Sequence, residues 1–128
     1  MLINKEYDWQ NKCILIAEDE EINYMFIEKI LEGTGAKLLR AINGKQAVDI
    51  VNSDQAVDLV LMDIRMPEMD GIEAAKIIKT AKPKLPIIAQ TCHESDIDQT
   101  QISGTHFDGF ISKPININKL IEMVDRKL

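Results

Sequence analysis

The sequence predicts a single α/β domain built on a parallel β-sheet with helices on both faces. Five short apolar runs of strand length alternate with segments in which apolar residues recur at helical spacing. Parallel strands joined by helical crossovers require helices on both faces of the sheet. The chain has 128 residues, 45% hydrophobic and 28% charged, which suits one compact core but not two. Because aromatic residues make up only 5%, aliphatic side chains must form most of that core.

The five predicted strands are apolar runs that end in polar or turn-forming residues. They are CILIA (13–17), AKLLRA (36–41), LVLM (59–62), PIIAQ (86–90) and GFIS (109–112). The first, third and fourth runs are almost continuously apolar, which indicates central strands buried on both faces. The second run carries Lys37 and Arg40, which favours a sheet edge.

Five helices are expected to follow these strands. Four have apolar residues at helical spacing, within 22–31, 47–51, 72–78 and 117–124. The remaining helix, the fourth in chain order, falls in ESDIDQTQISG (94–104), where apolar residues are sparse, and we expect it to be short.

The first eleven residues precede this alternation of strands and helices. We expect residues 1–11 to be a linker or the start of a fragment, and residues 12–128 to form the domain. Local packing of Tyr7 and Trp9 onto the domain is the alternative.

Charge and hydropathy exclude several classes of function. The net charge is -6 without a basic stripe, which argues against direct nucleic-acid binding. No apolar run approaches the length of a membrane span, and the first dozen residues lack a signal-peptide core, so this fragment is expected to be cytoplasmic without membrane contact. Cys13 and Cys92 fit neither a metal-ligand spacing nor a disulfide framework, which favours a reduced compartment.

Polar side chains follow four of the predicted strands and suggest one site. Ligands of parallel α/β sheets collect at the carboxyl ends of the strands, where these side chains would meet. The strand-end residues are Glu18, Asp19, Asp63, Thr91 and Lys113. Each of them alone is more simply explained as a turn residue, a local hydrogen-bonder or a solvated charge. Their joint placement at separate strand ends favours a functional site.

The carboxylates of this set predict a magnesium site. Neighbouring carboxylates repel and raise each other's pKa values unless a cation joins them. Magnesium prefers oxygen ligands and retains several waters, so one or two carboxylates, a backbone carbonyl and a phosphoryl oxygen would complete its shell. We expect Asp19 and Asp63 as ligands, Glu18 directly or through water, and the carbonyl oxygen of Arg65 as a main-chain ligand.

The same residues suit phosphoryl transfer to a carboxylate. Asp63 is the candidate nucleophile, because aspartyl-phosphate chemistry is an established use of this side chain. The charge on the phosphoryl oxygens needs compensation. Mg²⁺ would hold one oxygen, the Lys113 ammonium a second, and the Thr91 hydroxyl with backbone N–H groups a third.

Four stretches of the sequence match a known family. They are ILIAEDEEIN (14–23), LVLMDIRMPEMDG (59–71), PIIAQT (86–91) and DGFISKPI (108–115). With these stretches the chain resembles the receiver domain of response regulators and hybrid sensor kinases over about residues 12–128. The resemblance implies a flavodoxin-like, doubly wound five-stranded parallel sheet of order 2-1-3-4-5, flanked by five helices.

The resemblance also implies a role for each matching residue. Asp63 would be the phosphoacceptor, with Glu18 and Asp19 as Mg²⁺ ligands and Lys113 in contact with the phosphoryl group. Thr91 would be drawn toward a phosphoryl oxygen while Phe110 moves inward, changing the face formed by the fourth helix, the fifth strand and the fifth helix. A permanently buried core aromatic is the alternative for Phe110.

The two residues that directly follow Thr91 are a departure from the family pattern. Cys92 stands where the family usually has a small Ala or Ser, and His93 comes next. We hypothesise that Cys92, His93 and Arg65 restrict or steer water near the acyl phosphate and set its lifetime. A solvated loop residue is the alternative for His93.

The resemblance implies partners and leaves alternatives open. The phosphodonor would be the transmitter domain of a histidine kinase or a histidine phosphotransfer domain. The AEDEEIN and FISKPIN blocks resemble the C-terminal receivers of hybrid sensor kinases. In that case the parent protein would be a hybrid kinase and could be a membrane-anchored sensor. A stand-alone regulator would look much the same. The isolated domain would be no enzyme beyond catalysing its own phosphotransfer and dephosphorylation, and a weak homodimer stays open by analogy.

Other classes of protein fit less well. A receiver-like interaction module that is never phosphorylated is the main alternative, and retention of all five strand-end residues argues against it. A phosphatase with an aspartyl nucleophile would want a second Asp where Arg65 stands. A flavin-binding domain would need a phosphate-cradling loop where this chain carries acidic residues.

Overall fold

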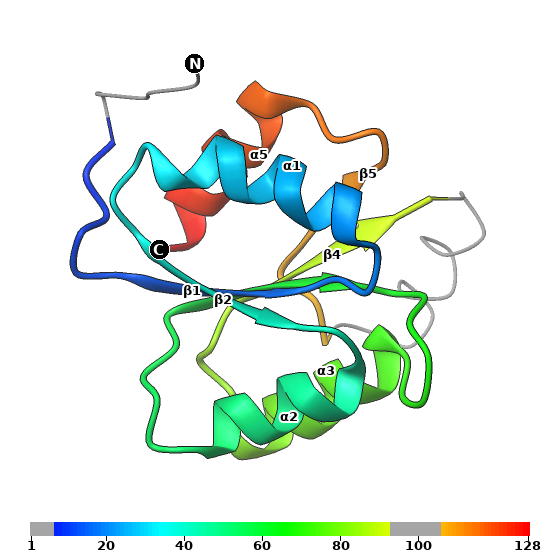
Figure 1. The fold of residues 1–128 in the computed structure, drawn as a ribbon. Coiled ribbons are helices and arrows are strands. Elements are labelled where there is room, and N and C mark those ends of the chain that lie inside the picture. Colours follow the sequence, from blue (N-terminus) through cyan, green and yellow to red (C-terminus); the bar gives the residue numbers. More distant parts are fainter. Residues whose placement is uncertain (1–6, 93–105) are drawn as a thin grey trace.

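The computed structural model describes residues 7–92 and 106–128, which form a five-stranded parallel sheet (Figure 1). The strands are β1 (Cys13–Ala17), β2 (Lys37–Ala41), β3 (Leu59–Asp63), β4 (Ile87–Thr91) and β5 (Gly109–Ser112). Their order is β2-β1-β3-β4-β5, and every neighbouring pair is parallel. The predicted fold class and strand order are therefore confirmed, with β2 at an edge as its charges indicated.

Four helices of the described chain cover the two faces of the sheet (Figure 1). They are α1 (Glu21–Glu32), α2 (Gly44–Asn52), α3 (Gly71–Ala81) and α5 (Ile117–Lys127). Helices α1 and α5 lie on one face and α2 and α3 on the other. The expected short helix within 94–104 lies outside the described residues. None of the helices described is long and apolar enough to span a membrane.

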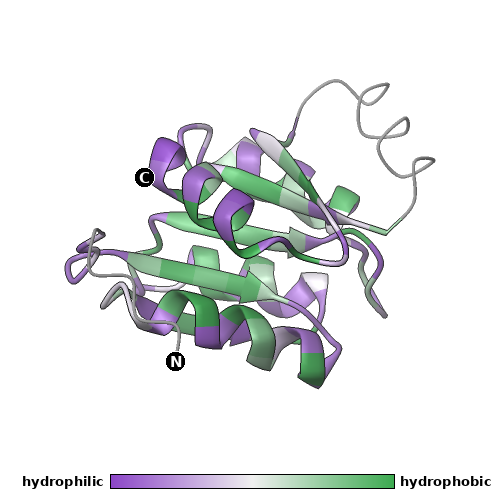
Figure 2. Cartoon of the chain, turned by 90° about the horizontal axis from the view of Figure 1, so that it is seen from above, coloured by the Kyte–Doolittle hydropathy of each residue, from purple (hydrophilic) through white to green (hydrophobic). Residues whose placement is uncertain are grey.

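Alternation along the strands divides the core between the two faces. Successive side chains of a strand point to opposite sides, so Ile14 and Ile16 pack with α1 and α5 while Leu15 packs with α2 and α3. The central strands are hydrophobic along nearly their whole length, whereas the helices carry polar residues on their outer sides (Figure 2). Because the central strands are buried on both faces, the carboxyl ends of β1, β3 and β4 are held in a fixed register.

Helix starts are stabilised by side-chain caps. The side-chain oxygens of Asn43, Asp70 and Asn116 each accept a hydrogen bond from a backbone N–H of the first turn of α2, α3 and α5. Such caps compensate backbone donors that would otherwise lack a partner. They fix where α3 begins after β3, and where α5 begins after β5.

Residues 7–12 pack onto the domain. Trp9 is 6% exposed, its backbone N–H donates to the carbonyl of Thr34 across 2.8 Å, and its ring lies 5.6 Å from that of Tyr7. The structure therefore places Tyr7 and Trp9 on the domain, as in the alternative to a linker. Residues 1–6 of the expected linker lie outside the described part of the chain.

Candidate functional site

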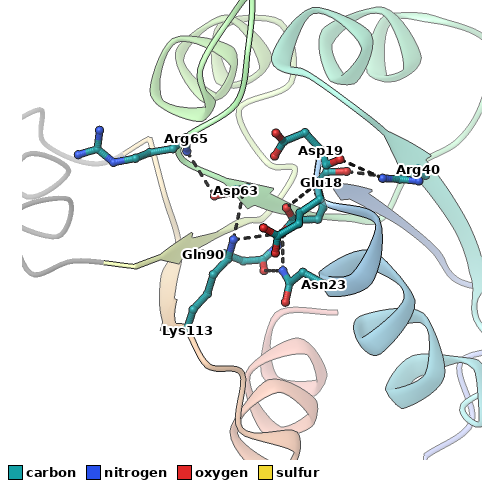
Figure 3. Close-up of polar contacts among 9 residues, drawn as sticks. Glu18, Asp19, Asn23, Arg40, Asp63, Arg65, Gln90 and Lys113 are labelled. Atoms are coloured by element: carbon teal, nitrogen blue, oxygen red, sulfur yellow. Dashed lines mark hydrogen bonds and ion pairs between the residues drawn. The ribbon is translucent and has the colours of Figure 1, made fainter.

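The carboxyl ends of β1, β3 and β5 bring the predicted acidic residues and Lys113 together (Figure 3). Glu18 and Asp19 directly follow β1, and Asp63 is the last residue of β3. One carboxylate oxygen from each of the three lies within 4.8 Å of the others. Glu18 is 0% exposed and Asp63 is 4% exposed, whereas Asp19 faces solvent. Two buried acids and one accessible acid therefore share one end of the sheet.

Lys113 supplies the cation that faces this cluster. Its Nζ lies 3.1 Å from Oδ2 of Asp63 and 3.2 Å from Oε1 of Glu18. One ammonium thus serves two buried carboxylates, and Asp19 adds a third negative charge at the mouth of the site.

The pKa values of Asp63 and Lys113 reflect this excess of negative charge. Burial, and secondarily the Glu18 charge, raise the pKa of Asp63 to about 6, although Lys113 pulls it in the opposite direction. Burial lowers the pKa of Lys113, but the carboxylates of Asp63 and Glu18 outweigh burial and leave that pKa raised. The site therefore favours a bound cation.

The residues present fit a hard divalent ion. Three carboxylates converge, and the only donor set they offer is oxygen, which Mg²⁺ prefers. The Lys113 ammonium compensates only part of their charge. Glu18, Asp19 and Asp63 are thus the side chains of the described chain that could hold Mg²⁺.

The loop after β3 approaches Asp63 closely. The backbone N–H of Arg65 donates to Oδ1 of Asp63 across 3.3 Å, so both oxygens of this carboxylate have a donor. A Cβ at Gly71 would lie 2.1 Å from the Asp63 carbonyl oxygen, so only glycine allows α3 to start here. The role expected for the Arg65 carbonyl stays a prediction.

Thr91 ends β4 with a buried hydroxyl. Its side chain is fully buried, and its Oγ1 has no hydrogen-bond partner among the described residues. Such a group normally costs free energy, which a ligand that accepts its hydrogen bond would recover. The placement suits the predicted role of Thr91 toward a phosphoryl oxygen.

Two of the remaining predicted residues, Phe110 and Cys92, lie in the described part of the chain. Phe110 is half-buried on β5, with its ring 5.9 Å from that of Phe107. Cys92 is exposed directly after β4, and His93 lies outside the described residues.

Sequence reasoning missed a second layer of contacts around Glu18 (Figure 3). Asn23 on α1 donates through Nδ2 to Glu18 Oε1 and, across 3.2 Å, to Oε1 of Gln90 on β4. Arg40 on β2 donates to the backbone carbonyls of Glu18 and Asp19 across 3.2 and 3.3 Å. The loop that carries two acidic site residues is therefore held from both sides.

The fold and the site define a class, a doubly wound α/β domain with an acidic cluster and a lysine at the carboxyl edge of its sheet. A family model described as the response regulator receiver domain matches residues 14–125. The chain therefore belongs to this family, whose members interact with histidine kinases and phosphotransfer partners in two-component systems.

Individual relatives agree with this assignment. The chain is 33% identical over 115 residues to the polar-differentiation response regulator DivK of Brucella anthropi, covering 88% of this chain and 93% of DivK. It superposes with a TM-score of 0.82, at 32% identity, on the receiver domain of a signal transduction histidine kinase from Syntrophus aciditrophicus, covering 91% and 89% of the two chains. A receiver domain of a Pseudomonas aeruginosa PAO1 sensor histidine kinase, with magnesium coordinated in its active site cleft, matches with a TM-score of 0.81 and 29% identity over 90% and 95% of the chains.

Proposed function

We propose that this receiver domain accepts a phosphoryl group from a phosphohistidine onto Asp63, with Mg²⁺ bound at the acidic cluster. The observation that carries the proposal is the position of Asp63. Its carboxylate is 4% exposed, lies 3.1 Å from the Lys113 ammonium, and shares the strand ends with Glu18 and Asp19. A buried carboxylate beside a cation and a potential metal site suits in-line attack on phosphorus.

The transfer step uses an ionised Asp63. With a pKa of about 6, this carboxylate is mostly deprotonated at neutral pH and has a lone pair available. One carboxylate oxygen attacks the phosphorus of a phosphohistidine whose other ring nitrogen carries a proton. A P–O bond forms, and the P–N bond breaks with its electron pair on the released imidazole nitrogen. The products are an acyl phosphate on Asp63 and a neutral histidine.

Charge compensation accompanies this step. Glu18, Asp19, Asp63 and the Arg65 carbonyl would hold Mg²⁺, which when bound neutralises charge on the phosphoryl oxygens. Lys113 is already at the carboxylate and would move with its charge onto a phosphoryl oxygen. The magnesium in the cleft of the P. aeruginosa relative supports this part of the proposal.

The unpartnered hydroxyl of Thr91 supports a switch. Donation from its Oγ1 to a phosphoryl oxygen would give this buried group its missing hydrogen bond. Phe110, half-buried on β5, would then move inward and change the surface around β5 and α5. Phosphorylation would shift the equilibrium between the outward and inward positions of Phe110 only as far as the phosphoryl group interacts more favourably with one of these two states.

The phosphodonor would be a histidine kinase transmitter or a histidine phosphotransfer domain in the cytoplasm. A hybrid kinase and a stand-alone regulator both remain compatible parents, since the relatives include both kinds. The lifetime of the acyl phosphate would depend on Arg65, Cys92 and His93. Equal dephosphorylation rates in the wild type and a Cys92→Ala, His93→Ala variant would contradict that dependence.

Intact-mass spectrometry after incubation with acetyl phosphate tests the proposal. We expect one phosphoryl adduct that requires Mg²⁺ and is absent from Asp63→Asn. If neither acetyl phosphate nor a phosphorylated histidine donor yields an adduct, the chain is an interaction module that is not phosphorylated.

A further inference from the structure

Gln90 places an amide side chain inside the sheet beside the acidic site. It is 1% exposed on the central strand β4, where its Cα pairs with that of Asp63 on β3. Its strand neighbour Ile88, two residues earlier and on the same face, packs in the apolar core below α1 and α5. Burying an amide at such a position costs free energy unless hydrogen bonds compensate, so its contacts need a physical reason.

The charge of Glu18 fixes how the two amides are turned. An ionised carboxylate only accepts hydrogen bonds, so Asn23 must present its NH₂ group to Glu18 Oε1. The same Nδ2 lies 3.2 Å from Gln90 Oε1, which accepts its second hydrogen. Turning the Gln90 amide over would set two NH₂ groups against each other, so its orientation follows from that of Asn23.

This chain of contacts ends in a buried donor. With its Oε1 committed to Asn23, Gln90 keeps its Nε2 buried and without a partner among the described residues. An apolar residue here would avoid that cost. The hydrogen bond that Gln90 Oε1 accepts from Asn23 is therefore the contact through which Gln90 can serve the site.

Glu18 is held on both carboxylate oxygens. Oε1 receives Asn23 and the Lys113 ammonium, and Oε2 accepts the backbone N–H of Glu20 across 3.1 Å. Asn23 itself is half-buried on the first turn of α1, and Gln90 is the acceptor that restrains its other hydrogen. Without Gln90, Asn23 would be free to rotate away from Glu18.

We propose that Gln90 is a positioning residue of the cation site, which acts through Asn23 to hold the Glu18 carboxylate toward Asp63 and thereby raises the affinity for Mg²⁺. The inference rests on the proposed function, because it concerns the same cation. It adds a residue from β4 whose side chain lies behind the acidic cluster rather than in it. Groups that orient metal ligands typically change metal affinity by about tenfold or more when removed.

Titration calorimetry with Mg²⁺ on the unphosphorylated domain tests this inference. Gln90→Met keeps the length of the side chain but removes its acceptor, and Asn23→Ala removes the donor. We expect each variant to bind Mg²⁺ about tenfold more weakly, because the orientation of Glu18 is lost in both. Since Gln90 acts through Asn23, the double variant should bind no more weakly than Asn23→Ala alone.

Ile88→Val is the matched control. It alters a buried side chain on the same strand and the same face, and it should lower stability while leaving the Mg²⁺ dissociation constant within about twofold. If Gln90→Met does not fold, Asn23→Ala at its half-buried helix position tests the same link.

The outcomes separate this inference from the proposed function. If the wild type binds Mg²⁺ and both variants bind it equally well, Gln90 and Asn23 are structural only and the inference fails. Additive losses in the double variant would overturn the route through Asn23. If the wild type itself binds no Mg²⁺, the proposed function fails at its cation site, and the inference fails with it.

Discussion

Lys113 Nζ lies 3.1 Å from Oδ2 of Asp63, yet this ion pair does not bring the acid back to its ordinary pKa. Burial and the neighbouring Glu18 outweigh the ammonium, so the pKa of Asp63 is raised to about 6. Between its unfolded value near 4 and this value, the folded protein binds more protons than the unfolded chain. The contribution of Asp63 to stability is therefore present below about pH 4 and is lost as pH rises through about 6.

Asp63→Asn should accordingly stabilise the metal-free domain at neutral pH. The substitution removes a buried charge whose raised pKa corresponds to roughly 2–3 kcal/mol, and it should flatten the decline of stability between about pH 4 and 7. Urea unfolding across this pH range measures both effects. Asp49→Asn, which removes an exposed acid on α2, is the control and should leave the profile unchanged. Identical profiles for Asp63→Asn and the wild type would contradict the raised pKa.

Lys113→Met should have the opposite effect at neutral pH. It leaves the buried carboxylates of Glu18 and Asp63 without their cation, at a cost of about 3–5 kcal/mol. The loss of stability should be smaller at pH 5. Without the Lys113 ammonium the pKa of Asp63 rises further, so at that pH the acid is protonated and no longer needs a cation. Chemical unfolding at pH 5 and pH 7.5 measures the difference.

An exposed ion pair provides the comparison for Lys113. Lys29 lies 3.4 Å from Glu32, with side chains 74% and 52% exposed, so Lys29→Met should cost at most about 1 kcal/mol at either pH. An equal and pH-independent cost for both lysines would mean that the Lys113 contacts contribute no more than a surface pair.

The site residues at the strand ends could be predicted from the sequence. The contacts between side chains of different helices and strands could not. Glu18 and Asp63 follow apolar runs, and the carboxyl ends of parallel strands must share one edge, so their proximity follows from the pattern. Gln90 is a visible polar exception in an apolar run, but nothing in the periodicity identifies Asn23, 67 positions away, as its partner. Such contacts depend on rotamers and on the packing of α1 against the sheet.

Arg40 illustrates the same limit and carries a third prediction. Its charge indicated only a sheet edge, yet its guanidinium donates to the carbonyls of Glu18 and Asp19 and lies 4.7 Å from the centre of the Tyr24 ring. Arg40→Lys retains the charge but not the forked, planar donor set. We expect amide hydrogen exchange at residues 18–20 to accelerate about tenfold, as the loss of about one charge-assisted hydrogen bond implies.

Hydrogen exchange followed by mass spectrometry measures this loop directly. Lys37→Ala is the control, because Lys37 is exposed on the same strand and its ammonium contacts Gln55, away from the acidic loop. Unchanged exchange in Arg40→Lys would mean that the backbone of the loop is held without the guanidinium.

Trp9 is buried although it precedes the predicted start of the domain. A single tryptophan before the first strand has no periodic partner in the sequence, so the pattern places the boundary at residue 12. In the structure its side chain lies in the core below α1 and α5, and its backbone N–H binds Thr34 after α1. Trp9→Ala should therefore cost about 3–5 kcal/mol in urea unfolding, as truncation of a buried aromatic does. Gln10→Ala, at the exposed neighbouring position, should change stability by less than about 0.5 kcal/mol. If Trp9→Ala is equally neutral, residues 7–11 are a linker and the domain begins at residue 12.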